Sequence, residues 1–94
     1  YITYYVTSVS WFIRMKNKIV NRQPEVGNFI REFRLLSGLT QEQFAAYVGV
    51  TYPTVNRWEN ARTTPSPIAL QVIQHKVLEL GEKGHKLLAK YIDN

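Results

Sequence analysis

The chain has 94 residues, no cysteine and a formal net charge of +5 at neutral pH. A chain of this length builds one hydrophobic core, and the lack of cysteine excludes disulfides and thiolate metal sites. Its two histidines, His75 and His85, stand ten residues apart with no carboxylate arranged around them as a further ligand. We therefore expect neither a metal nor a cofactor.

The positive charge is concentrated at the N-terminus. Residues 1–24 contain four basic side chains and no acidic one, whereas residues 25–94 contain eight basic and seven acidic side chains. We therefore expect an N-terminal extension or basic arm over 1–24 and a nearly neutral globular domain over 25–94. The basic run 14–22 is either a solvated tail or an arm that contacts DNA phosphates. Net charge alone is weak support for DNA binding by the globular part.

Residues 1–13 are β-branched and aromatic with partial alternation, which is typical of a strand. Two interpretations of the first 14 residues stay open. Either translation begins at Met15, the only methionine, or the segment is a genuine strand or arm that pairs with a partner chain. The uncharged run is too short to span a membrane and lacks the basic start and cleavage site of a signal peptide. We expect a cytoplasmic protein.

From residue 25 onward the apolar residues recur at intervals of three and four, which is the period of a helix. The first predicted helix, 25–36, is followed by Gly38, a residue suited to a left-handed C-cap. The second predicted helix begins at a capping box formed by Thr40 and Gln43, and Gly49 ends it after two turns.

The stretch TYPTVNRWEN predicts a third helix, 52–60, although it contains a proline. Thr51 serves as the N-cap, so Pro53 falls in the first turn, where its missing N–H would have no partner within the helix. Val55 and Trp58 lie three residues apart and are therefore expected to face the core.

Ser66 followed by Pro67 predicts the start of a fourth helix, because a capping residue precedes a proline at the first helical position. A fifth helix is predicted over 82–92. Whether its apolar residues close the core or form a dimer seam stays open. The pattern as a whole predicts an all-α fold, a compact five-helix bundle with a strand-like or disordered N-terminal extension.

The second and third predicted helices are separated by only three residues, the first of which is Gly49. Two short helices joined in this way cross at a steep angle, which is the geometry of a helix-turn-helix. Glycine supplies the backbone freedom that the turn needs, and the small Ala45 allows a close crossing.

The run LTQEQFAAYVGVTYPTVNRWENAR resembles the helix-turn-helix of the phage-repressor-like family of bacterial regulators, also called the XRE or Cro/repressor family. It shares with that family the Gln-Glu opening, the buried alanine, the Gly-Val-Thr turn, the Thr-Val pair and the Trp-Glu-Asn ending. The resemblance covers roughly residues 25–80 and implies a lambda-repressor-like fold. One departure is Ala61, where the family usually has glycine, and this residue disfavours a strict left-handed turn.

The resemblance implies that helix 52–60 inserts into the major groove of double-stranded DNA. The base contacts that it implies are Tyr52, Pro53, Asn56 and Arg57. Arginine can bind guanine and asparagine can bind adenine through two hydrogen bonds, and the tyrosine and proline can pack on thymine methyl groups. The implied contacts to the DNA backbone are Gln41, Thr51, Thr54, Asn60 and Arg62. Arg34 and Glu59 match a largely buried ion pair that has a structural role.

The resemblance implies a sequence-specific transcriptional regulator, repressor-like and acting as a homodimer. Two alternatives stay open: the antitoxin and autoregulator of a toxin–antitoxin pair, with a toxin as partner, or a protein-interaction adaptor that keeps the fold without binding DNA. The tyrosine, asparagine and arginine on the exposed face of helix 52–60 favour DNA. We expect no enzyme, because the sequence has no paired carboxylates, no nucleophile–base arrangement and no phosphate-binding glycine loop.

Overall fold

The computed structural model describes residues 19–92. Within this range the chain forms α2 (Glu25–Leu36), α3 (Gln41–Val48), α4 (Tyr52–Glu59), α5 (Pro67–Leu78) and α6 (Glu82–Lys90). The only β-pairing in this part of the chain is an isolated antiparallel bridge between Ile19 and Ile92. The expected all-α, five-helix architecture is therefore confirmed. The strand-like stretch 1–13 lies outside the described residues.

Three of the described helices, α3, α4 and α5, begin at the capping residues that the sequence contains. The Thr40 hydroxyl accepts a hydrogen bond from the backbone N–H of Gln43, whose side-chain oxygen accepts one from the backbone N–H of Thr40. Gly49 ends α3 in the left-handed conformation, at φ 83°. Thr51 and Ser66 cap α4 and α5, each with a proline in the first turn.

The residues that precede α2 pair with the C-terminal end of α6. The backbone N–H of Val20 donates to the carbonyl oxygen of Tyr91 at 2.8 Å, next to the bridge between Ile19 and Ile92. Helix α6 ends at Lys90, just before this pairing and two residues earlier than the sequence predicts. Ile19 and Val20 are only 3% and 7% exposed, so the buried core extends into the basic N-terminal segment.

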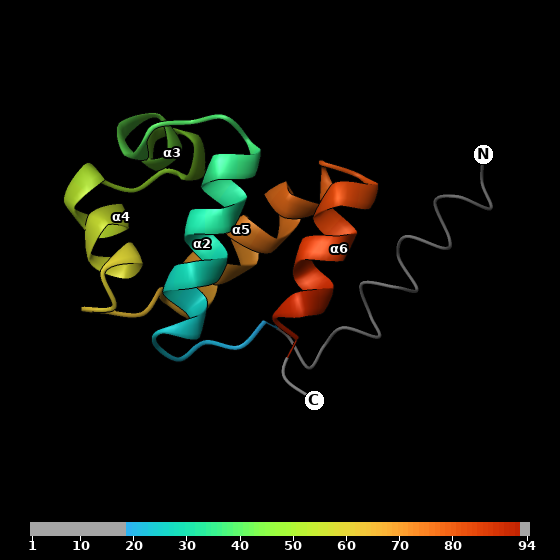
Figure 1. The fold of residues 1–94 in the computed structure, drawn as a ribbon. Helices are drawn as coiled ribbons and strands as arrows, with labels where there is room; N and C mark the ends of the chain where they lie inside the picture. Colours follow the sequence, from blue (N-terminus) through green and yellow to red (C-terminus); the bar gives the residue numbers. More distant parts are fainter. Residues whose placement is uncertain (1–18, 93–94) are drawn as a thin grey trace.

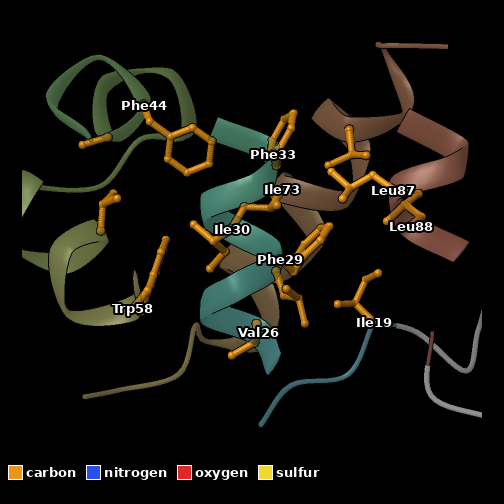
Figure 2. Packing of buried hydrophobic residues seen from close by; sticks show 14 residues of the cluster. Ile19, Val26, Phe29, Ile30, Phe33, Phe44, Trp58, Ile73, Leu87 and Leu88 are labelled. Carbon is orange, nitrogen blue, oxygen red and sulfur yellow. The ribbon is translucent and has the colours of Figure 1, made fainter. Parts of the chain in front are cut away.

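Helix α2 is central in the bundle and contacts both α4 and α6 (Figure 1). Figure 2 shows Phe44 of α3 and Trp58 of α4 on one side of α2, with Leu87 and Leu88 of α6 on the other. Phe33 packs edge-on against Phe44, with ring centroids 5.4 Å apart. Trp58 is buried, as the sequence predicts. The apolar face of α6 closes the core, which is one of the two alternatives that the sequence leaves open.

The N-terminus of α2 lies directly against the C-terminus of α4. A Cβ atom on Gly27 would lie 2.4 Å from the carbonyl oxygen of Trp58, so only glycine permits this approach. Gln23 strengthens the contact, because its side-chain nitrogen donates to the carbonyl oxygens of Trp58 and Thr63 at 3.0 and 2.6 Å. Its side-chain oxygen accepts from the N–H of Gly27 at 3.0 Å. The end of α4 and the loop after it are thereby fixed to α2.

Ala61 adopts the left-handed conformation, with φ 61°. This corrects the expectation that an alanine at this position disfavours a left-handed turn. This conformation costs a residue with a Cβ atom about 1–2 kcal/mol. Two hydrogen bonds offset the cost: the N–H of Ala61 donates to Trp58 at 3.2 Å, and the N–H of Arg62 donates to Arg57 at 2.9 Å, both to carbonyl oxygens. The second bond is the one that closes a helix C-terminus through a left-handed residue.

Tyr91 joins the end of α6 to α2, because its hydroxyl donates to the Glu32 carboxylate. Burial, this hydrogen bond and the negative charge of Glu32 raise the pKa of Tyr91 to about 12 from an ordinary 10.0. A folded-state pKa above the unfolded value adds stability that is complete below pH 10.0 and is lost as the pH rises through about 12. We therefore expect Tyr91→Phe to be less stable than the wild type at neutral pH. This difference in unfolding free energy should disappear at strongly alkaline pH.

Urea unfolding of the wild type and Tyr91→Phe across this range measures the difference in unfolding free energy directly. Other titrating groups are common to both proteins and cancel in the difference. A difference that stays constant with pH would contradict the role given to the hydroxyl.

Candidate nucleic-acid interface

Helix α4 has a buried apolar face and an exposed polar face. Val55 and Trp58 point into the core, whereas Tyr52 is 46% exposed and Arg57 is also exposed. The outward face forms a shallow hollow of about 450 Å³. The residues that line it are Tyr52, Pro53, Asn56, Arg57, Asn60 and Arg62. The structure thus brings together all four residues implied as base contacts and two of those implied as DNA-backbone contacts.

The other three residues implied as backbone contacts lie outside this lining. Thr51 and Thr54 bond to each other at the N-terminus of α4, with their hydroxyl oxygens 2.8 Å apart. The side chain of Gln41 is half-buried and bonds within the protein, since its nitrogen donates to Glu59 at 3.0 Å and its oxygen accepts from Asn56 at 3.1 Å. Any phosphate contact from Gln41 must therefore come from its backbone N–H or from a rearranged side chain.

Arg34 of α2 and Glu59, the last residue of α4, form a close ion pair. Nε of Arg34 donates to Oε2 of Glu59 at 2.7 Å, and Nη2 donates to Oε1 at 3.0 Å. The Glu59 side chain has no exposed surface, and that of Arg34 is 15% exposed. This two-point geometry is the strongest arrangement that an arginine and a carboxylate can adopt.

The Glu59 carboxylate stays charged in spite of its burial. Burial by itself raises the pKa of this carboxyl group, but hydrogen bonds from Arg34, Gln41 and Arg31, together with the charge of Arg34, outweigh burial and leave the pKa below its ordinary value. A charged carboxylate accepts hydrogen bonds and cannot donate them. Every side chain that hydrogen-bonds to the Glu59 carboxylate must therefore turn a donor group toward it.

The comparison with protein families matches residues 30–75 to the helix-turn-helix family. The match includes α3, the turn that begins at Gly49, and α4, and the two helices contact each other. The match supports a phage-repressor-like helix-turn-helix over residues 30–75. The matched family consists of DNA-binding regulators of transcription. No curated protein and no solved structure matched the chain in the corresponding searches.

Two residues of the helix-turn-helix region and its surroundings have site roles that sequence reasoning missed. Arg31 donates to both the side chain and the backbone carbonyl of Glu59, at 3.4 and 3.3 Å. Its position three residues before Arg34, on the same face of α2, is a signal that could have identified it. Gln23 had no such signal, because it contacts α4 from outside any helix.

Two further findings apply to residues 19–92 alone. No helix in this range is long and apolar enough to cross a membrane. No three side chains that could ligate a metal ion lie close together in it.

Proposed function

We propose that the chain is a sequence-specific, repressor-like transcriptional regulator that inserts α4 into the major groove of double-stranded DNA. The observation that carries this proposal is the composition of the hollow on α4, which is lined by two arginines, two asparagines, a tyrosine and a proline and by no acidic side chain. Guanidinium and amide groups match the hydrogen-bonding edges of guanine and adenine. Because the lining contains no carboxylate, it would not repel the negatively charged phosphates of DNA.

The position of each residue suggests its role. Asn56 and Arg57 lie on the exposed side of α4 and are the proposed readers of base edges, with Tyr52 and Pro53 next to them for thymine methyl groups. Arg62 follows the helix in the loop and is a proposed phosphate contact. The remaining proposed contacts to the DNA backbone are Asn60, Thr51, Thr54 and the N-terminal end of α3 at Gln41.

Arg57 and Arg62 provide the test, because the proposal gives them opposite behaviour. Arg57→Ala should weaken binding to the preferred site by about 1–3 kcal/mol and relax the preference at one base pair, with little loss on random DNA. Arg62→Ala should weaken both DNAs alike and lower the salt slope of binding by about one unit. Titrations of both variants on both DNAs at two salt concentrations measure these differences.

Each outcome assigns a role. If Arg57→Ala weakens all sequences equally, Arg57 is a phosphate contact, and base reading falls to the tyrosine, proline and asparagine of α4. If neither variant changes the affinity, α4 is not in a groove and the proposal is wrong.

The two alternative functions differ in their relation to this surface. An adaptor is less well supported, because the exposed face of α4 carries none of the acidic or bulky aliphatic side chains that such a role would tolerate. An antitoxin would bind DNA through the same face and would differ from a repressor only by its toxin partner. A small toxin gene next to the gene for this chain would therefore favour the antitoxin.

We also expect a homodimer on a palindromic site with half-sites about 34 Å apart, because a single helix-turn-helix rarely holds a site alone. The apolar face of α6 is not available as a seam, since Leu87 and Leu88 are buried in their own core. Segment 1–14 is then the seam that the sequence suggests. Sedimentation with and without these residues, together with a DNA footprint, measures this. A concentrated monomer with a footprint of one half-site would contradict the expectation.

A further inference from the structure

A chain of hydrogen bonds connects the buried carboxylate of Glu59 with the exposed face of α4. The Nε2 atom of Gln41 donates to Oε1 of Glu59 at 3.0 Å, and Nδ2 of Asn56 donates to Oε1 of Gln41 at 3.1 Å. The three residues come from two helices, with Gln41 in α3 and the other two in α4. The chain therefore crosses the helix-turn-helix between its core and its proposed DNA-binding face.

The buried charge determines the direction of both amide groups. Side-chain amides are nearly symmetrical in shape, so either end can face a neighbour unless hydrogen bonding decides between them. Glu59 accepts only, and Arg34 holds it in place, so the NH₂ group of Gln41 must face it. The oxygen of Gln41 is then directed at Asn56, which must turn its own NH₂ group inward.

This orientation leaves a specific pattern on the exposed side of Asn56. Its oxygen accepts no hydrogen bond from any described residue, and its NH₂ group has a second hydrogen beyond the one given to Gln41. An acceptor beside a donor is the pattern that pairs with the N6 amino group and N7 of adenine. The opposite orientation would direct the oxygen inward and would present only donors.

We propose that Gln41 is a positioning residue, which transmits the orientation set by Glu59 to Asn56 and thereby makes position 56 prefer adenine. This inference rests on the proposed function, since it requires that α4 binds in a major groove. It differs from a phosphate contact by Gln41, which would contribute equally to all DNA sequences.

Selection of bound sequences from a random DNA pool tests the inference on the full chain. Asn56→Ala first identifies the base pair that Asn56 reads. Gln41→Met removes the hydrogen bonds of the side chain, keeps its length and leaves the backbone N–H in place. Gln71→Met, at an exposed glutamine of α5, is the matched control.

We expect Gln41→Met to lose the adenine preference at the same base pair as Asn56→Ala, by about tenfold or more, with other positions unchanged. In the double variant, Gln41→Met should have no further effect at that base pair. Gln71→Met should select the wild-type sequence. In the free protein, the side-chain NH₂ protons of Gln41 should exchange with solvent more slowly than those of Gln71, which is a readout independent of DNA.

The outcomes separate this inference from the function on which it rests. A wild type that selects no sequence refutes the proposed function and the inference with it. A specific wild type whose adenine preference survives Gln41→Met refutes the inference alone. Uniform loss at all positions makes Gln41 a phosphate contact and also refutes it. If Gln41→Met fails to fold, equal exchange rates of the two glutamine side chains in the wild type would still overturn the inference.

Discussion

Glu59→Ala is expected to lower the free energy of unfolding by about 3–5 kcal/mol, because it leaves the guanidinium of Arg34 without its carboxylate in a largely buried position. The same change removes the acceptor for Gln41, at 3.0 Å in the wild type. For a domain of this size each kcal/mol lowers the melting temperature by roughly 4–8 °C. Urea unfolding and thermal melting measure the loss, and DNA binding should weaken as well.

Asn56→Ala is the control for this prediction. Asn56 lies on the same helix, but its side chain is half-exposed and makes one hydrogen bond within the described residues, so its loss should change stability by less than about 1 kcal/mol. DNA binding should nevertheless suffer in both variants. Equal melting temperatures would show that the ion pair with Arg34 does not have the structural role given to it.

The pH dependence gives an independent check on Glu59. A folded-state pKa below the ordinary 4.5 adds stability that is present above pH 4.5 and is lost as the pH falls through the folded-state pKa. The difference in unfolding free energy between the wild type and Glu59→Ala should therefore narrow in acid.

Gly84→Ala is expected to destabilise the protein by about 3 kcal/mol, at the upper end of the range for overpacked cores. A Cβ atom at this position would lie 1.9 Å from the carbonyl oxygen of Val77 and 2.9 Å from its carbonyl carbon. Both atoms belong to the backbone of α5, so no side-chain rotation can relieve the clash. Helix α6 would have to move away and loosen the packing of Leu87 and Leu88, which are both buried.

Alanine favours a helix over glycine by about 1 kcal/mol, so helix propensity alone would make Gly84→Ala more stable. A net loss of stability must therefore come from the clash. Lys83→Ala is the matched control, since Lys83 is the exposed neighbour of Gly84 in α6 and its loss should change stability by no more than about 0.5 kcal/mol. Stability of Gly84→Ala equal to that of the control would show that α5 and α6 are less closely packed than described.

The sequence by itself determined where most helices begin and which side of each faces the core. Thr40, Thr51 and Ser66 cap their helices through backbone groups only three residues away, so the signal is contained in the local sequence. The period of the apolar residues likewise indicates the buried face, as the burial of Val55 and Trp58 shows. The contact between α3 and α4 is likewise local, because only three residues separate the two helices.

Only the tertiary structure decided the contacts between residues far apart in the chain. Gln41 and Glu59 are separated by 18 positions, and nothing in either local pattern indicates that the amide donates inward to a carboxylate. Ile19 bridges Ile92 at the other end of the described chain, just beyond the end of α6. Such pairings depend on how whole helices pack, because hydrogen bonds and burial act between whatever groups the fold brings within a few ångströms.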